Sequence, residues 1–466
     1  MTGGVRCTMP FMATTLDPAL KKLPIPGPKG HWFKGNLSAF ARDRLGFLTS
    51  IAREYGDIVA IRFLNKKILV VNHPDLVEEV LVTRNRQFIK HFALRFAKPT
   101  LGEGLLTSEG DFWRRQRRLS QPAFHREKVA GHARVMVEFT ERMLEGWSGG
   151  MKLDVQEAMM RLTLEIVAKC LFDADVSGDS AEASGAMETV LHCFTARVNS
   201  AIRVPMFLPT PTNRRLYKAK AQLDRIVYRI IAERRASGED RGDLLSMLLE
   251  ATDPVEEGGA GMTDLQLRDE AMTLFMAGHE TTANTMAWVF FLLSTHPEVE
   301  AKLLAEVDEA LPDRAPTFDD LPKLPYAERV ITEALRLYPT VWLVGREAIE
   351  PTEVGGHPVA VGTTVYMSQW VLHRDPRFFD DPLAYRPERW EGGLAKKIPR
   401  YAYFPFGGGP RICIGNAFAM MEAVLLLATI ARRFRVKVVD PEGVVPLPTL
   451  TLRPVGGIEV VLEARG

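Results

Sequence analysis

The sequence predicts a mainly helical α+β protein, with small β-sheets near both ends of a helical centre. Three observations support this fold class. Apolar residues recur with helical periodicity over residues 74–338 and 415–433. β-rich runs are confined to regions near residues 55–73, 343–370 and 434–464. Hydrophobic residues make up 46% of the 466 residues, enough for a sizeable core, and we expect a single domain over residues 1–466.

The N-terminal half contains one β-rich region followed by helices. Residues 58–71 hold two β-rich runs around residues 65–66, which predicts a hairpin. A mostly helical pattern then covers residues 74–235, with polar breaks at residues 175–185 and 205–212.

The longest helical pattern runs from Thr263 to about Thr295. Thr263 and Gln266 have the spacing of a capping box, and Pro297 lies just beyond the end. A helix of this length would extend for about 50 Å, enough to cross the whole molecule. Residues 353–373 then become β-rich, and residues 434–464 alternate like short strands.

Charge and cysteine content exclude several classes of protein. The net charge of +1 gives no field that would favour nucleic acid. The 4 cysteines form no C-x-x-C pair and are too few for a disulfide framework, which suits a cytoplasmic protein. The first residues lack the apolar stretch of a signal peptide or membrane anchor, so we expect neither.

The most informative segment is a glycine-rich loop around Cys413, with the sequence FPFGGGPRICIGNAF over residues 404–418. A helical pattern follows the cysteine directly. The positive end of a helix dipole favours a thiolate, and glycines let backbone N–H groups approach the sulfur. Such a loop could hold a soft, anionic ligand for haem iron, although a lone buried cysteine before a core helix is the plainer alternative.

The spacing of five residues in this loop resembles the cysteine-ligand loop of the cytochrome P-450 family. They are Phe406, Gly409, Arg411, Cys413 and Gly415. The resemblance covers nearly the whole chain. It implies the family's triangular, mainly helical fold, with haem b between the long central helix and the helix after the cysteine. It also implies that Cys413 is the axial ligand of the iron.

A second motif lies in the middle of the long helix, where Ala277, Gly278, Glu280 and Thr281 occur within the run AGHETT. A glycine inside a helix costs about 1 kcal/mol relative to alanine, so its presence calls for an explanation. It could leave room for a diatomic ligand beside a distorted turn, or it could be a packing notch against another helix. The motif resembles the family's acid-threonine pair, which implies that Thr281 and Glu280 manage oxygen and protons.

Two further sets of residues resemble the framework of the family. Glu333 and Arg336 share a helix face, and with Arg389 they resemble the Glu-Arg-Arg cluster that supports the cysteine loop; Trp390 stands where the family usually has Phe. The second set resembles the contacts to the haem propionates, since arginine suits carboxylates. Its members are Trp113, Arg117, Arg346, Arg411 and His91.

The family lines its substrate pocket from several separate segments. The matching residues here are mostly apolar, which implies a lipophilic substrate. They are Phe96, Phe207, Leu274, Phe275, Val341, Trp342, Leu343, Val344 and Leu450. A fatty acid is the preferred substrate on this resemblance, with terpenoids, steroids and polyketides as alternatives.

The expected function is therefore that of a haem-thiolate monooxygenase, which inserts one atom of O2 into a C–H bond. The segment after Cys413 is too short for a reductase domain, so we expect electrons from a separate ferredoxin or flavodoxin and its NAD(P)H-dependent reductase. We also expect a monomer. The alternative from another class is a haem-binding sensor or carrier without turnover.

Overall fold

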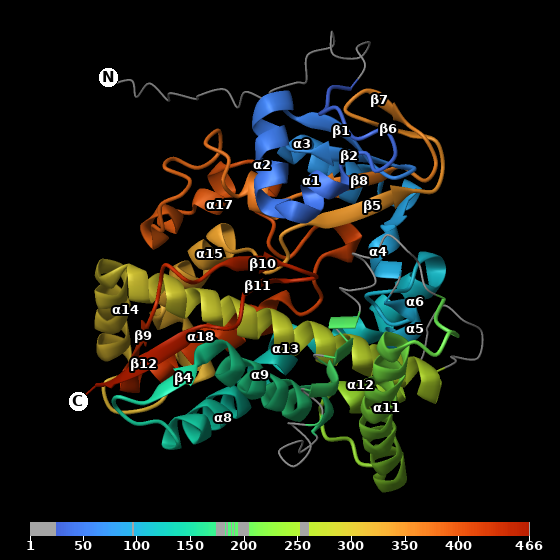
Figure 1. Cartoon of the computed structure of the whole chain (residues 1–466). Coiled ribbons are helices and arrows are strands. Elements are labelled where there is room, and N and C mark those ends of the chain that lie inside the picture. Colours follow the sequence, from blue (N-terminus) through green and yellow to red (C-terminus); the bar gives the residue numbers. More distant parts are fainter. Residues whose placement is uncertain are drawn as a thin grey trace, which may run out of the picture.

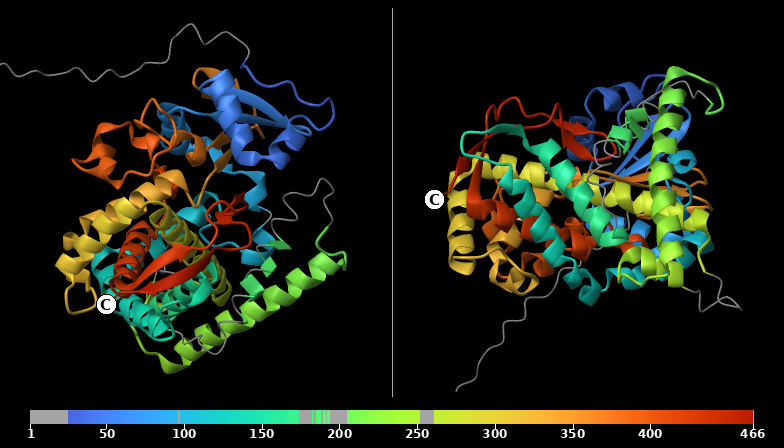
Figure 2. Two further views of the ribbon diagram at one scale, coloured as in Figure 1. Left: turned by 60° about the vertical axis from the view of Figure 1, so that its left-hand side comes forward. Right: turned by 90° about the horizontal axis from the view of Figure 1, so that it is seen from below.

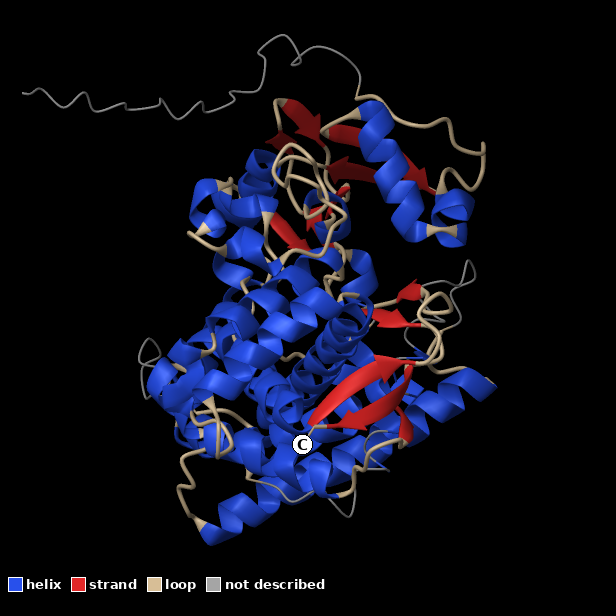
Figure 3. Ribbon diagram, turned by 90° about the vertical axis from the view of Figure 1, so that its left-hand side faces the viewer, coloured by secondary structure: helices blue, strands red, loops and turns tan. Residues whose placement is uncertain are grey.

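The computed structural model describes residues 25–95, 97–173, 182, 185–187, 189–190, 192–193, 205–251 and 261–465. Helices form most of this part of the chain, and the strands form several small sheets (Figure 3). The predicted mainly helical α+β class is confirmed. Two short strands lie inside the region predicted to be helical, because three-residue strands leave too little periodicity to detect.

The helices of the described residues are α1 (Leu37–Arg42), α2 (Arg44–Tyr55), α3 (Pro74–Glu78), α4 (Phe92–Arg95), α5 (Lys98–Leu101), α6 (Gly110–Ser120), α7 (Arg126–Gly131), α8 (Ala133–Glu145), α9 (Val155–Phe172), α11 (Pro211–Ser237), α12 (Leu244–Glu250), α13 (Asp264–Thr295), α14 (Pro297–Ala310), α15 (Pro325–Leu337), α16 (Gln369–Leu372), α17 (Leu394–Lys397) and α18 (Asn416–Arg433). The strands are β1 (Ile58–Phe63), β2 (Lys66–Val71), β3 (Phe88–Lys90), β4 (Lys152–Asp154), β5 (Val344–Ala348), β6 (Thr352–Val354), β7 (His357–Val359), β8 (Thr364–Met367), β9 (Phe434–Val438), β10 (Pro446–Pro448), β11 (Leu452–Pro454) and β12 (Glu459–Ala464).

The largest sheet has 5 strands in the order β1-β2-β8-β5-β3. β1 and β2 form the predicted hairpin, with Ile58 opposite Val71. β3, which the sequence pattern missed, pairs antiparallel with β5, so Lys90 lies opposite Arg346. This pairing brings two cations from distant parts of the chain to the same edge of the sheet.

The long helix α13 crosses the helical part of the molecule, with α9 and α18 packed beside it (Figures 1 and 2). Its start confirms the predicted capping box: the Thr263 side chain accepts from the Gln266 N–H, and the Gln266 side chain accepts from the Thr263 N–H. The helix continues without interruption to Thr295. Each turn in its centre is therefore flanked by helical turns on both sides.

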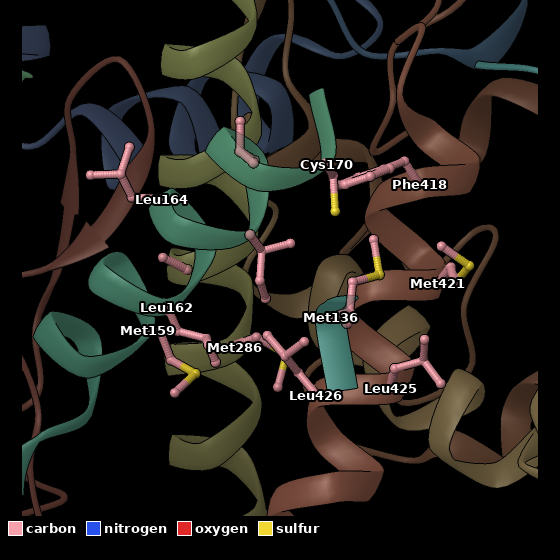
Figure 4. Packing of buried hydrophobic residues seen from close by; sticks show 14 of the residues in the cluster. Met136, Met159, Leu162, Leu164, Cys170, Met286, Phe418, Met421, Leu425 and Leu426 are labelled. Carbon is pink, nitrogen blue, oxygen red and sulfur yellow. The ribbon is translucent and has the colours of Figure 1, made fainter. Parts of the chain in front are cut away.

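A continuous apolar core joins α8, α9, α13 and α18 (Figure 4). It includes Met136 of α8, Met159 of α9, Met286 of α13 and Leu426 of α18, all of which are buried. Because the helix after the cysteine loop and the long helix share this core, their separation is fixed by close packing.

Candidate active site

A cavity of about 410 Å³ lies between the middle of α13 and the loop before α18. Its lining includes Ala277 and Thr281 of α13 on one side and Phe406, Cys413 and Gly415 of the loop on the other. The structure therefore brings together the two motifs that the sequence singled out, although more than a hundred residues separate them in the chain.

Backbone contacts hold the cysteine loop in one shape. The Cys413 N–H donates to the Phe406 carbonyl oxygen at 2.9 Å, and Gly415 immediately precedes α18. Gly409 has a φ of +66°, and a Cβ atom at this position would lie 1.9 Å from the Leu81 carbonyl oxygen. Only glycine satisfies both constraints, so Gly409 fits the loop against the segment after α3.

The Cys413 side chain is exposed to the cavity that it lines. The protein atoms packed around the thiol desolvate it and so raise its pKa, while the Gly415 N–H and the Arg117 charge lower it. The sequence predicted only the favourable influence of the helix end; the structure adds the cost of burying a charge. The thiolate therefore depends on Arg117, which also donates to the Ile412 carbonyl oxygen at 2.9 Å, and on any metal that binds the sulfur.

The motif in α13 presents Thr281 to the cavity. The Thr281 hydroxyl donates to the Ala277 carbonyl oxygen at 2.6 Å, and the helix is not interrupted there. A Cβ atom on Gly278 would lie 2.8 Å from Val167 Cγ2 of α9. The glycine thus serves the packing of two helices, which was the plainer of the two interpretations, and at the same time lines the cavity.

Glu280 also lines the cavity, but the Thr281 hydroxyl donates to the Ala277 carbonyl oxygen and not to the Glu280 carboxylate. Its Oε1 atom accepts from the Thr451 hydroxyl at 2.6 Å. Burial raises the pKa of Glu280, and the bond from Thr451 and the charge of Arg453 lower it. Thr451 was not predicted as a site residue, since it lies in a turn between two three-residue strands.

The family model "Cytochrome P450" matches residues 25–460 of the chain. The chain belongs to the cytochrome P-450 family. It is 40% identical to a Streptomyces melanosporofaciens protein named Cyclooctatin synthase, over 94% of this chain and 95% of that protein. It is 41% identical to Cyclooctat-9-en-7-ol 5-monooxygenase from the same organism, over 90% of this chain and 89% of that protein.

Two further comparisons agree with this assignment. Pentalenene oxygenase of Streptomyces avermitilis is 35% identical, over 92% of this chain and 95% of that protein. The crystal structure of the cytochrome P450DA heme domain superposes with a TM-score of 0.86 at 30% identity, covering 95% of this chain and 98% of that chain. The chain is thus a cytochrome P-450 monooxygenase with the fold of that family.

The residues around the cavity fit the haem that the family implies. Among the described residues, no group of three or more His, Cys, Asp or Glu side chains could hold a metal ion. A single thiol facing a large cavity therefore suits an iron whose other ligands come from a porphyrin. Three basic side chains, Lys90, Arg346 and Arg411, line the cavity. Burial lowers the pKa of Lys90 and of Arg346, the charge of Arg411 lowers both further, and the charge of Arg346 also lowers that of Lys90. Buried cations of this kind need anions, and haem has two propionates.

The individual cations are held by protein contacts. Lys90 Nζ donates to the Leu105 and Ser108 carbonyl oxygens, each at 2.9 Å. Burial lowers its pKa to about 6, so Lys90 needs an adjacent anion, such as a propionate, to be charged at neutral pH. Arg411 pairs with Glu109 and lies over the Trp113 ring, 4.2 Å from its centroid. Lys90 and Glu109 were missed by the sequence analysis; only their places beside His91 and before the Trp113 helix could have suggested them.

The remaining predicted haem contacts also line the cavity. They are Trp113, Arg117 and His91. Burial and the charge of Arg346 lower the pKa of His91 to about 3, so its ring is neutral. Its Nδ1 atom is buried and has no hydrogen-bond partner, which leaves one polar atom of the site to be satisfied.

Glu333 is the centre of a fully buried ion cluster. Arg336 donates to both of its carboxylate oxygens, at 2.9 and 2.8 Å, and Arg389 Nε donates at 2.8 Å. The Trp390 indole N–H also donates to Glu333, at 2.8 Å, so the departure from the family's Phe adds a partner. Arg336 continues to the carbonyl oxygens of Pro382 and Ala384, and thereby ties α15 to the segment that leads towards the cysteine loop.

The predicted substrate residues divide into two groups. Those that line the cavity are Leu274, Val341, Leu343, Val344 and Leu450. Phe275 does not: it stacks on Phe172 of α9, with ring centroids 4.5 Å apart. Trp342 does not line the cavity either, and its indole N–H donates to the Thr449 carbonyl oxygen at 3.0 Å. Phe207 is 81% exposed at the surface, and Phe96 lies outside the described residues.

Side-chain direction explains why Phe275 does not line the cavity. Adjacent residues of a helix or strand point in different directions, so Leu274 and Phe275 face different neighbours.

Within the described residues, no helix is long and apolar enough to cross a membrane.

Proposed function

We propose that this P-450 hydroxylates a C–H bond of a cyclic, terpenoid-like molecule, using haem b, O2 and electrons from separate redox partners. The observation that carries the proposal is the position of Cys413, which faces Thr281 across one largely apolar cavity. When bound, haem supplies the iron at which O2 is activated.

The substrate class rests on the cavity and on the relatives. A fatty acid would need a cation for its carboxylate. The cavity-lining cations among the described residues are Lys90, Arg117, Arg346 and Arg411. Lys90, Arg346 and Arg411 lie together, and Arg117 lies beside Cys413. We assign them to the propionates and the thiolate, which leaves none for a fatty acid. The relatives are named for cyclooctatin, cyclooctat-9-en-7-ol and pentalenene, which supports a terpenoid over the fatty acid favoured earlier.

A binding titration tests the substrate class. We expect cyclooctat-9-en-7-ol or pentalenene to displace the water on the ferric iron and produce a type I spectral shift, because an apolar ligand gains free energy by burial in the cavity. Palmitic acid should require at least about tenfold higher concentrations, a difference of about 1.4 kcal/mol. Tighter binding of palmitic acid than of both cyclic compounds would contradict the proposal.

The protein residues have separate roles in this proposal. The Cys413 sulfur would ligate the haem iron, and the Gly415 N–H and Arg117 would stabilise its charge. The Thr281 hydroxyl is presented to the cavity by α13, where it could donate a hydrogen bond into the cavity if it left the Ala277 carbonyl oxygen. Glu280 lies in the wall of the cavity, where burial shifts its equilibrium towards the neutral form that can donate a proton.

Replacing Thr281 with alanine should uncouple the reaction without loss of haem. We expect the carbon monoxide spectrum to stay unchanged, while the share of electrons released as hydrogen peroxide rises about tenfold or more, since one positioned proton donor is worth a factor of about 10² to 10⁴. Product and peroxide are measured per NADPH with a surrogate ferredoxin and its reductase. Thr281→Ser is the matched control, and coupling in Thr281→Ala equal to that of the wild type would remove Thr281 from its role.

The redox partner is proposed to be a ferredoxin or flavodoxin that docks by charge. Arg114 and Arg118 of α6 are exposed, as a basic docking surface requires. Arg115 of the same helix is buried and donates to the Gly261 carbonyl oxygen at 3.3 Å. Arg115 therefore does not contribute to this surface. The monomeric state remains a prediction.

A further inference from the structure

Glu280 is the last acceptor in a chain of hydrogen bonds whose donors all point towards it. Gln156 Nε2 donates to Asn284 Oδ1 at 2.7 Å. Asn284 Nδ2 donates to the Thr451 hydroxyl at 3.4 Å, and that hydroxyl donates to Glu280 Oε1 at 2.6 Å. Each group therefore points its donor towards the carboxylate.

The chain connects three separate elements and leads from the surface to the cavity. Gln156, at the start of α9, is partly exposed, whereas Asn284 of α13 is fully buried. Thr451 is 4% exposed and lies in the turn between β10 and β11. This turn is held in place by Thr449, whose N–H and hydroxyl both donate to the Thr451 carbonyl oxygen, at 3.0 and 2.9 Å.

The chemistry of these hydrogen-bonded side chains decides whether they can transfer protons or only orient one another. Amide hydrogens of Asn and Gln do not ionise near neutral pH, so these groups cannot pass protons from one to the next. They can orient the Thr451 hydroxyl, since an oxygen that accepts from Asn284 turns its own hydrogen towards Glu280. A donor aimed at a carboxylate stabilises the ionised form, which opposes the effect of burial.

We propose that Thr451 and Asn284 are positioning residues that hold Glu280 turned away from Thr281 and keep its carboxylate able to exchange its proton. This inference rests on the proposed role of Glu280 as the acid of the monooxygenase. Burial raises the pKa of Glu280; Thr451 and Arg453 are the groups that lower it. Without the Thr451 hydroxyl, Glu280 should stay protonated to higher pH and be free to turn.

The protonation of Glu280 can be followed directly in the holoenzyme. Infrared difference spectra of the ferrous carbon monoxide complex, taken before and after photolysis, report carboxyl groups next to the cavity. The band of protonated Glu280 is identified by its loss in Glu280→Gln, and is titrated between about pH 5 and 9. In Thr451→Val we expect its midpoint to rise by about one to two pH units, because a hydrogen bond to a charged group is worth that much.

Three variants separate positioning from general damage. Thr451→Ser keeps the hydroxyl and should restore the wild-type midpoint. Asn284→Leu should give a smaller upward shift, since its bond to Thr451 is long. Thr332→Val removes a hydroxyl of α15 that donates to the Glu328 carbonyl oxygen of the same helix, away from Glu280, and should leave the midpoint unchanged.

The outcomes distinguish this inference from the proposed function. The same midpoint in wild type and Thr451→Val, or no Glu280 band in either, would overturn the inference while leaving the monooxygenase proposal intact. A wild-type protein whose carbon monoxide complex lacks the thiolate signature would instead reject the proposed function itself, before any carboxyl band is considered.

Discussion

Replacing Cys413 with serine should abolish the red-shifted Soret band expected of the reduced, carbon monoxide-bound protein. The band arises from thiolate ligation, and a serine hydroxyl remains neutral and is a much weaker donor to iron. The expected effect is complete loss of the band rather than a shift. The absorption spectrum after reduction under carbon monoxide provides the measurement, with total haem determined separately.

Cys170 offers the matched control for this change. It is a buried thiol of α9 that does not line the cavity. Cys170→Ala should retain the band in full, with only the modest destabilisation of a small core change. If Cys413→Ser kept the band, or if Cys170→Ala lost it, the assignment of the iron ligand would be wrong.

Replacing Glu333 with glutamine should destabilise the protein by about 3–5 kcal/mol, because the change leaves the charge of Arg336 buried without its counter-ion. Both side chains have 0% exposure. Arg336 also holds carbonyl oxygens of the segment before the cysteine loop, so the loss should reach the haem site. We expect low haem content after purification and loss of the thiolate signature at a lower urea concentration.

Glu328→Gln is the control for the Glu333 change. Glu328 lies on the same helix, α15, but is exposed to solvent. A surface substitution of this kind should alter stability by no more than about 0.5 kcal/mol. Wild-type haem content and wild-type resistance to urea in Glu333→Gln would show that the cluster does not support the site.

Much of the fold and the centre of the site could be predicted from the sequence. The capping box at Thr263 and the β1–β2 hairpin are local features, set by residues that are close together in the chain. The loop around Cys413 and the motif at Thr281 also depend on local spacing, and both line the cavity. The short strands β3 and β4 could not be predicted, since each is defined by a distant partner.

The parts of the site that were missed depend on long-range contacts. Lys90 lines the cavity because β3 pairs with β5, and Thr451 reaches Glu280 from a turn 171 residues away in sequence. The misplaced aromatic residues show the same limit. Phe275 is on the long helix as expected, but its ring packs against Phe172 rather than the cavity.

The amino-acid sequence by itself determined the elements of this protein and the chemistry available to them. A thiol in a glycine loop, an acid and a threonine in mid-helix, and a Glu-Arg pair one turn apart are all properties of neighbouring residues. Only the tertiary structure decided which side chains meet. It turned Glu280 to Thr451, placed Val167 against Gly278, and added the burial that raises the pKa of Cys413. Those outcomes depend on packing between distant segments, and the dielectric surroundings of a charge exist only after the chain has folded.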